Sequence, residues 1–289
     1  MLPMMIIDHA LGNPIPMADS AYLSSSTAID TESVLEFIDV GLNYTTRDRP
    51  MVVMEEVSLT IQQSEFVSIV GPSGCGKTSL LRMISGLNPA HQGTVCFRGE
   101  PITKPLKNVG IAFQNPVLLP WRNTIKNVLL PLEIVQPHKH KLRQQRSHYI
   151  SMAQELLATV GLRDFQTHYP WQLSGGMRQR ASLCRALIHQ PEILLLDEPF
   201  AALDAFTREE MWDMLQRLWE RTQCTSVLVT HDLREALFLS DTVYVMGPRP
   251  SRIVLKLSVN LPRPRSLEMC FSDEFHHMYS QLRQHIHRN

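Results

Sequence analysis

The stretch Phe66-Val-Ser-Ile-Val-Gly-Pro-Ser-Gly-Cys-Gly-Lys-Thr78 determines the fold. Residues 66–70 form a nearly continuous apolar run without the alternation of a half-exposed strand, so they predict a strand buried on both faces, as in a parallel sheet. Residues 71–78 match G-x-x-x-x-G-K-[ST] at every fixed position. Residues 79–85, stopped by Gly86, predict a helix. A strand, a glycine-rich loop and a helix in this order predict a phosphate-binding loop.

The residues of this loop are suited to holding the phosphates of a nucleotide. Glycine lets successive backbone N–H groups point at phosphate oxygens, and the following helix adds its positive end. Lys77 is predicted to reach the β- and γ-phosphates, and the Thr78 hydroxyl to ligate Mg²⁺. A glycine-rich turn that fits by chance is the alternative, and the flanking strand and helix favour nucleotide binding. The predicted cofactor-binding residues of the loop are Gly71, Pro72, Ser73, Gly74, Cys75, Gly76, Lys77, Thr78 and Ser79.

Two neighbouring acids follow a second buried strand pattern. Residues 193–196 are Ile-Leu-Leu-Leu, and Asp197 and Glu198 come directly after them. Ligands of open α/β sheets bind at the carboxyl ends of strands. We therefore expect Asp197 to hold Mg²⁺ through water and Glu198 to polarise an attacking water. An aspartate after a strand is more often a turn residue, so this interpretation depends on the phosphate loop.

A second anion site is predicted at Leu173-Ser-Gly-Gly-Met-Arg-Gln-Arg180. Ser174 is a good helix N-cap, and Gly175 and Gly176 leave backbone N–H groups exposed at the start of a helix. One triphosphate does not need two helix N-termini from one subunit. The economical arrangement is a head-to-tail dimer in which Ser174 of one copy faces Lys77 of the other. A capped helix start without a ligand is the alternative.

The rest of the chain predicts an α/β fold. Residues 36–40 and 57–61 have the composition of antiparallel strands, and residues 226–230 predict a further buried strand. Spaced apolar positions at 124–132 and 147–160 predict helices. Strands that alternate with helices indicate an α/β core.

Composition excludes several classes of protein. The 289 residues hold 28 Lys and Arg against 28 Asp and Glu, which argues against a nucleic-acid binder. The five cysteines occur singly, which suggests a reducing cytoplasm and neither a disulfide framework nor a zinc site. No uncharged apolar run approaches the length that crosses a bilayer. The N-terminal residues lack the basic segment of a signal peptide.

The sequence resembles the ATP-binding subunits of ABC transporters over roughly residues 34–259. Residues 71–78 are similar to their Walker A motif, 193–198 to Walker B and 173–176 to their signature. The resemblance implies an α/β fold, with a P-loop NTPase core of the ABC ATPase type. It also implies an N-terminal antiparallel β region and a helical insert at about 116–187.

The resemblance assigns roles to four more residues. Gln114 resembles the glutamine that contacts Mg²⁺ and the attacking water and links to the membrane domain. His231 resembles the switch histidine that touches the γ-phosphate, Tyr44 the aromatic that stacks on adenine, and Asp204 the D-loop aspartate. Met177 stands where glutamine is common, and it removes no phosphate ligand. The implied catalytic set is Glu198, His231 and Gln114, and the implied metal set is Thr78, Gln114 and Asp197.

Looser patterns at 114–121, 174–180, 247–252 and 261–265 resemble the nitrate/sulfonate/taurine group of importers. This resemblance implies ATP hydrolysis, with Mg²⁺, that powers uptake of a small solute through separate transmembrane permease subunits. The implied partners are a second copy of the chain, the permease and, indirectly, a periplasmic or surface solute-binding protein. The implied location is the cytoplasmic face of the cell membrane, as a peripheral subunit.

The predicted domains are a flexible leader at 1–33, the ATPase domain at 34–259 and a basic tail with a helix at 260–289. The flexible leader contains no Lys or Arg. One alternative function is a soluble ABC-type ATPase of DNA repair or translation, which would usually carry a coiled-coil insertion or two nucleotide domains. Another is a nucleotide sensor without turnover, against which Glu198 and His231 argue. The sequence does not identify the solute, the permease or a regulatory role for either end.

Overall fold

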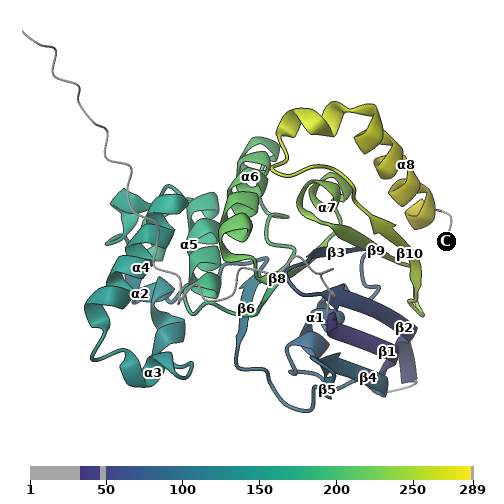
Figure 1. The fold of residues 1–289 in the computed structure, drawn as a ribbon, viewed down its shortest axis with the longest axis horizontal. Helices are drawn as coiled ribbons and strands as arrows, with labels where there is room; N and C mark the ends of the chain where they lie inside the picture. The colour runs from purple at the N-terminus through teal and green to yellow at the C-terminus, as the bar shows by residue number, and fades with distance from the viewer. Residues whose placement is uncertain (1–32, 46–49, 288–289) are drawn as a thin grey trace, which may run out of the picture. The chain divides into compact units, whose positions relative to one another are not determined.

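The computed structural model describes residues 33–45 and 50–287, which form two sheets with helices around them (Figure 1). The predicted leader lies outside the described residues except for Ser33. The first sheet is antiparallel, with the strand order β2-β1-β4-β5. Its strands are β1 (Ser33–Thr45), β2 (Pro50–Gln62), β4 (Gln92–Phe97) and β5 (Glu100–Pro101).

β1 and β2 are longer than the strands predicted at 36–40 and 57–61. Their pairing shifts register several times along its length. Asp39 and Glu56 lie within these shifts and have left-handed backbones, with φ of 49° and 52°. Bulges of this kind place polar residues inside a strand and interrupt its alternation. The apolar pattern therefore revealed only part of each strand.

The second sheet is mostly parallel, with the order β10-β9-β3-β8-β7-β6. Only β10, at the edge, runs antiparallel to its neighbour. The strands are β3 (Phe66–Val70), β6 (Val109–Phe113), β7 (Ile193–Asp197), β8 (Thr225–Thr230), β9 (Thr242–Met246) and β10 (Ile253–Ser258).

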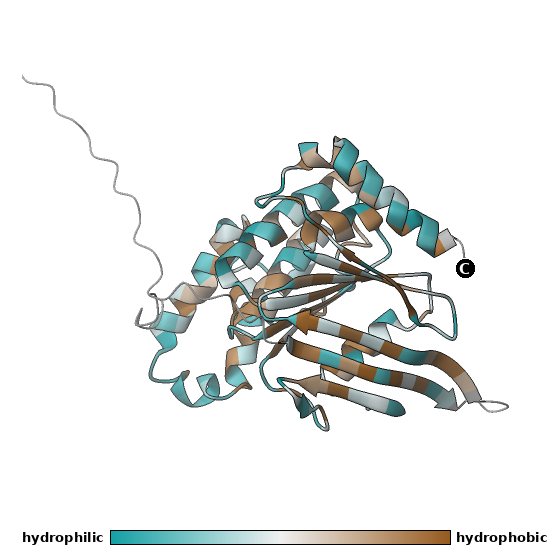
Figure 2. Ribbon diagram, turned by 45° about the vertical axis from the view of Figure 1, so that its right-hand side comes forward, coloured by the Kyte–Doolittle hydropathy of each residue, from teal (hydrophilic) through white to brown (hydrophobic). Residues whose placement is uncertain are grey.

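β3 lies between two hydrophobic cores, as its sequence predicts. All five of its residues are buried. Phe66 and Val70 pack in the core that the helices α5, α6, α7 and α8 share, whereas Val67 and Ile69 pack in the core of α1 and the antiparallel sheet. Figure 2 shows these hydrophobic strands in the interior and more hydrophilic faces on the helices outside. Each fully buried aliphatic side chain contributes roughly 1.5–3 kcal/mol.

The helices are distributed along the chain as the predicted fold class requires. α2 to α5 lie between β6 and β7 in the sequence and form one group beside the sheet (Figure 1). The α/β class, with an antiparallel N-terminal region and a helical insert, is thus confirmed. The helices are α1 (Lys77–Ile84), α2 (Thr124–Val128), α3 (His138–Lys141), α4 (Arg146–Thr159), α5 (Gly175–Leu187), α6 (Ala205–Thr222), α7 (Leu233–Leu239) and α8 (Asp273–His287).

The chain after β10 packs on the same core as the sheet. α8 buries Phe275, Met278 and Leu282, which are spaced to share one helix face. The buried Arg265 donates hydrogen bonds to backbone carbonyls at the end of α7, namely those of Leu237, Phe238 and Ser240. The domain boundary at residue 260 stays a prediction, yet the residues beyond it contribute to the main core.

We expect Leu282→Ala to lower the free energy of unfolding by about 2–5 kcal/mol, because it leaves a cavity under α8. Urea denaturation measures this change. Gln284→Ala, on the exposed face of the same helix, should change stability by less than about 0.5 kcal/mol. Equal stability of the two variants would contradict the packing of α8 on the core.

Candidate nucleotide-binding site

The predicted site residues gather at the carboxyl ends of the parallel strands. The phosphate loop follows β3, Gln114 follows β6, and His231 follows β8. Asp197 is the last residue of β7, and Glu198 comes next. Parallel strands bring these ends to one edge of the sheet, which is where open α/β sheets bind ligands.

Two glycines of the phosphate loop have backbone conformations that favour glycine. Gly74 and Gly76 have φ of 77° and 107°, in the left-handed region. A Cβ on Gly76 would lie 2.5 Å from the Met54 side chain, and one on Gly74 would lie 2.8 Å from the Arg249 guanidinium. The loop therefore turns tightly between β3 and α1 and keeps its backbone close to its neighbours.

Lys77 has a buried ammonium that is satisfied by the loop itself. Its side chain is 6% exposed, and Nζ donates to the carbonyls of Gly71 at 3.0 Å and Pro72 at 3.1 Å. Nζ also lies 4.0 Å from Glu198 Oε1. A buried cation requires such partners. Phosphate oxygens bound in the loop would supply stronger, charge-assisted partners for the same ammonium.

Asp197 and Glu198 have different surroundings. Asp197 Oδ1 accepts a hydrogen bond from Thr78 Oγ1 at 3.0 Å. Burial raises the pKa of Asp197, and the Thr78 hydrogen bond partly offsets this rise. Glu198 Oε2 lies 3.2 Å from His231 Nδ1. One acid therefore faces the predicted metal ligand Thr78, and the other lies between Lys77 and His231.

The Glu198 backbone is strained. Its φ is 46°, a left-handed conformation that is uncommon for a residue with a side chain. Its N–H donates to the carbonyl of Val229 on β8 at 2.9 Å, which holds the residue in place. Strain of this kind costs on the order of 1–3 kcal/mol and concentrates at functional sites.

Most of the predicted residues line a single pocket of about 400 Å³. Sequence reasoning missed three residues of its wall: Met51, Val53 and Arg249. The first two belong to the part of β2 that the bulges concealed. Arg249 follows the buried strand β9 in a Gly-Pro-rich turn, and that position at a strand end was the available signal. The predicted residues in the lining are Tyr44, Ser73, Gly74, Gly76, Lys77, Thr78, Ser79, Gln114, Asp197 and Glu198.

Tyr44 lies at the end of the pocket that β1 and β2 form. Its hydroxyl is 3.0 Å from Ser79 Oγ, and Met51 and Val53 line the pocket with it. An aromatic ring beside two apolar side chains suits a flat base, whereas Lys77, Thr78 and Glu198 lie near Asp197.

Cys75, in the phosphate loop, is buried, and burial raises the pKa of its thiol.

Eight predicted residues do not line the pocket. Gly71, Pro72 and Cys75 belong to the phosphate loop and His231 contacts Glu198, whereas the other four lie at the starts of α5 and α6. Ser174 caps α5, where its Oγ accepts from the Met177 N–H at 3.2 Å, and Gly175 has open space where a Cβ would be. Asp204 caps α6 through Thr207. A single chain thus leaves Ser174, Gly175, Gly176 and Asp204 outside the site around Lys77.

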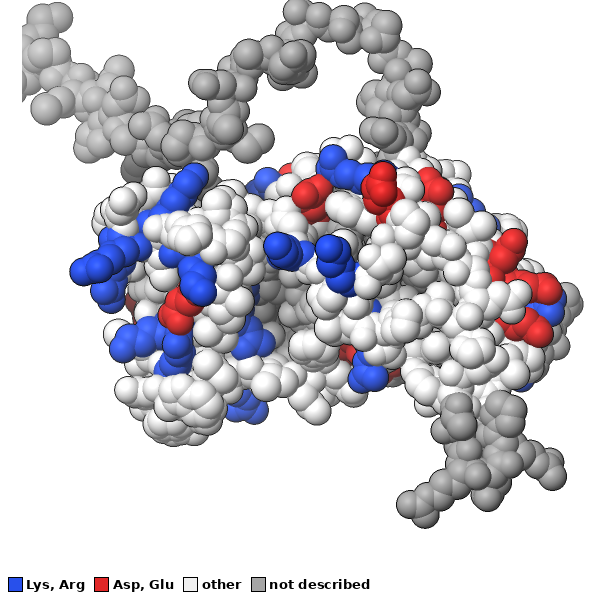
Figure 3. All heavy atoms as spheres, turned by 90° about the horizontal axis from the view of Figure 1, so that it is seen from below, with Lys and Arg blue, Asp and Glu red and all other residues white. Residues whose placement is uncertain are grey.

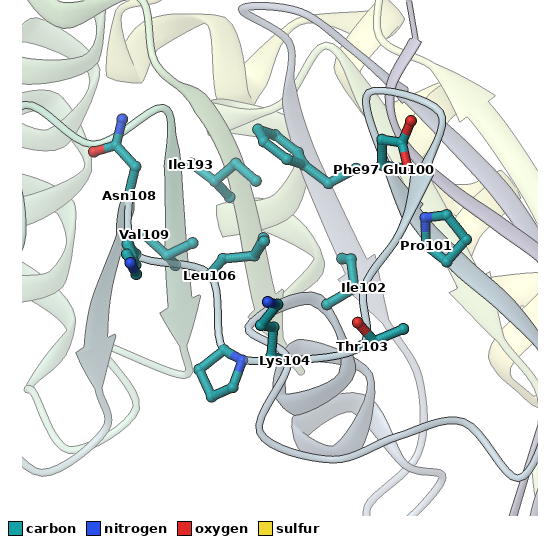
Figure 4. Close-up of a pocket in the computed structure, with 12 residues that line it drawn as sticks. Phe97, Glu100, Pro101, Ile102, Thr103, Lys104, Leu106, Asn108, Val109 and Ile193 are labelled. Carbon is teal, nitrogen blue, oxygen red and sulfur yellow. The ribbon is translucent and has the colours of Figure 1, made fainter.

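A second cavity of about 450 Å³ lies at the opposite edge of the parallel sheet (Figure 4). It includes Val109 and Ile193, the first residues of β6 and β7, together with Phe97, Ile102 and Leu106. None of the predicted site residues lines it. Because ligands of such sheets bind at the carboxyl ends of strands, the nucleotide site is assigned to the pocket around Lys77.

The described residues contain neither a cluster of metal-binding side chains nor a helix that could cross a membrane. Within residues 33–45 and 50–287, no group of three or more His, Cys, Asp or Glu is arranged to hold a metal ion. The helices of the same residues are too short or too polar to cross a membrane. All five cysteines are free and buried, as their single occurrence in the sequence suggests.

The fold and the pocket define a P-loop nucleotide hydrolase, with a phosphate loop after β3 and a carboxylate pair after β7, on either side of β8. Residues 54–201 match the family model described as ABC transporter, and the chain belongs to this family. It is an ATP-binding subunit that couples ATP hydrolysis to transport. The resemblance seen in the sequence is confirmed.

Curated relatives cover most of the chain. The nitrate import ATP-binding protein of Synechococcus elongatus is 39% identical over 91% of this chain and 94% of its own. The taurine import ATP-binding protein of Escherichia coli O157:H7 is 42% identical over 73% of this chain and 80% of its own. Among solved structures, the dimeric ATP-binding cassette MJ0796 with ADP and phosphate has a TM-score of 0.65. It is 28% identical and covers 79% of this chain and 100% of its own.

Glu235 is a buried acid behind His231. It lies in the first turn of α7, where its Oε2 accepts from Thr230 Oγ1 at 2.6 Å, and it is 3% exposed. Burial raises its pKa from 4.5 to about 8, with smaller effects from the Thr230 hydroxyl, Asp232 and Arg208. The folded protein therefore keeps a proton here at neutral pH.

The unfolded chain releases that proton near pH 4.5, so this group's contribution to stability is lost as the pH rises from 4.5 to about 8. Glu235→Gln removes the titration. Its stability relative to the unmodified protein should therefore increase across this window, by at most roughly 1.4 kcal/mol per pH unit. Urea denaturation at several pH values tests this, with Glu155→Gln on the exposed face of α4 as control. A difference that does not vary with pH would refute the raised pKa.

Proposed function

We propose that this chain is the ATPase subunit of an importer for a small anionic solute of the nitrate, bicarbonate, sulfonate and taurine type. The observation that carries the ATPase mechanism is the meeting of Lys77, Thr78, Asp197 and Glu198 in one pocket. The solute class is supported by the relatives, whose names specify nitrate, taurine, bicarbonate and aliphatic sulfonates. In this proposal the subunit binds the nucleotide and does not contact the solute. The permease and a solute-binding protein would therefore select among these solutes.

In this proposal, phosphate groups bind over the loop at 71–76, and Lys77 exchanges its contacts with loop carbonyls for contacts with phosphate. Thr78, Asp197 and Gln114 would hold Mg²⁺. Their oxygen atoms are of the kind that Mg²⁺ prefers, and phosphate oxygens usually complete such a site. Bound Mg²⁺ would neutralise charge that develops on the phosphates during transfer.

Glu198 is the proposed general base. Its carboxylate would accept a hydrogen bond from the attacking water and help to remove its proton, while His231 holds the second oxygen of that carboxylate. Lys77 Nζ lies 4.0 Å from the other oxygen, Oε1. The strained backbone fixes this carboxylate relative to the end of β8.

We further propose that two copies associate head to tail, so that Ser174 and its glycines complete the site around the partner's Lys77. Within one chain these residues lie outside the pocket, and nothing lies within 4 Å of the place where a Gly175 Cβ would be. The MJ0796 cassette was solved as a dimer after hydrolysis, which supports this arrangement. Asp204, at the start of α6, would lie in the same interface.

The proposed permease contact involves the helical insert. Val117, Trp121 and Trp171 are large apolar side chains with exposures of 61%, 71% and 66%. Exposed apolar groups of this size often mark protein interfaces. Gln114, three residues before Val117, would link this surface to the nucleotide. Exposed Lys and Arg also gather on the side of the insert (Figure 3). Such a subunit would lie at the cytoplasmic face of the membrane as a peripheral protein.

The two acids provide the test of the proposed mechanism. Glu198→Gln should bind ATP and lose roughly 10²–10⁴-fold in hydrolysis rate, because a positioned base is removed. Asp197→Asn should instead weaken Mg²⁺-dependent ATP binding. Calorimetric ATP affinities with and without Mg²⁺, together with phosphate release, separate these effects. Lys77→Ala should lose most affinity or turnover. Full turnover by Glu198→Gln would show that another group activates the water.

The dimer is tested at Ser174. Ser174→Arg should block hydrolysis and leave ATP binding by the monomer intact, because the bulky cation disturbs only the partner's site. Hydrolysis by the unmodified protein should rise more than linearly with its concentration in the range where dimers form. A monomer that hydrolyses ATP at a specific rate independent of concentration would refute the composite site.

A further inference from the structure

The turn between β9 and β10 brings an arginine onto the phosphate loop. Arg249 lies in the segment Gly247-Pro-Arg-Pro-Ser-Arg252, one of the stretches whose pattern resembles the importer group. Its Nε donates to the Gly74 carbonyl, and Nη1 lies 3.4 Å from Met51 Sδ. The guanidinium covers the place where a Gly74 side chain would be. It therefore spans the gap between the loop and β2 at the wall of the pocket.

The backbone beside Arg249 is fixed by contacts to both neighbours. Ser251 Oγ donates to the Cys75 carbonyl at 2.6 Å, and the Ser251 N–H donates to the Val53 carbonyl at 3.0 Å. The Ser251 carbonyl accepts from the Glu55 N–H at 3.0 Å. The turn thus holds Arg249 in position before a ligand arrives, which reduces the entropy lost on binding.

The charge of Arg249 is available to a ligand. Among the residues that the structure describes, no carboxylate lies within 4.0 Å of its guanidinium, whereas Arg252 in the same turn pairs with Glu55 and Glu56 at 2.9 Å. The other cation of the pocket, Lys77, lies near Glu198. Arg249 thus adds a positive charge to a pocket that suits a polyanion.

We propose that Arg249 is a nucleotide-binding residue that holds the ribose and α-phosphate end of the nucleotide. Its contact with Met51 places it on the side of Tyr44 and Val53, the apolar end suited to the base. The γ-phosphate end is defined by Thr78, Asp197 and Glu198. This inference rests on the proposed nucleotide site. It implies that ATP and ADP depend on Arg249 equally, because both carry the same ribose and α-phosphate.

The experiment measures ADP and ATP affinities of the full chain, with Mg²⁺, by calorimetry at low temperature. Arg249→Gln keeps a donor for the Gly74 carbonyl but removes the charge, and Arg249→Lys keeps the charge. We expect Arg249→Gln to weaken both nucleotides by about tenfold, and Arg249→Lys by less than about threefold. Affinity of the unmodified protein should also fall more steeply with added salt than that of Arg249→Gln.

Two controls separate this role from a structural one. Arg252→Gln breaks the ion pairs of the same turn and should leave both affinities unchanged. The melting temperature without nucleotide should be the same for Arg249→Gln and the unmodified protein, because Arg249 is exposed. Arg249→Met provides a second charge-free variant should glutamine disturb the fold.

The inference is overturned if Arg249→Gln and Arg249→Met bind both nucleotides like the unmodified protein. It is also overturned if Arg249→Lys loses as much affinity as Arg249→Gln, or if only ATP binding falls, which would place the contact at the γ-phosphate. Unmodified protein that binds neither nucleotide would refute the proposed nucleotide site itself. If the unmodified protein binds both nucleotides and Lys77→Ala does not, the proposed nucleotide site stands. A negative result with the Arg249 variants then refutes only the role of Arg249.

Discussion

The burial of β3 on both faces is the constraint on which the site depends. Alternate residues of this five-residue strand pack into separate cores, so the strand can neither slide nor rotate without exposing apolar surface. The phosphate loop begins where that strand ends, and α1 continues from the loop into the core beneath the antiparallel sheet. The position of every backbone N–H that would face a phosphate is thus set by packing several residues away.

The charged groups of the site restrain one another within this frame. Lys77 is buried with an acid nearby, Glu198 lies between that ammonium and His231, and Asp197 is linked to Thr78. These groups come from the ends of β7 and β8 and from the start of α1, so the packing of the sheet and that helix fixes their distances. A polyanionic ligand would enter a pocket whose charged side chains are already held by neighbouring groups.

The sequence predicts much of this arrangement because its signals are local. The pattern at 71–78 specifies a loop, and the apolar runs at 66–70 and 193–196 specify buried parallel strands that bring their ends together. Bulges at Asp39 and Glu56 concealed the true length of β1 and β2, and with it Met51 and Val53 in the pocket wall. Arg249 acts across a separation of 175 residues from Gly74, which no local periodicity records. The placement of Ser174 concerns a second chain and stays a prediction.

The pairing partners of β3 come late in the chain. Ser68 pairs with Leu228 on one side and with Val243 on the other. During synthesis, β3 and the phosphate loop emerge long before either neighbour has been made. Strands that await distant partners fold slowly and expose aggregation-prone edges. The nucleotide pocket is therefore completed only after β8, β9 and the turn that holds Arg249 have been translated, and a chain truncated before β8 has the whole loop sequence without the sheet that shapes it.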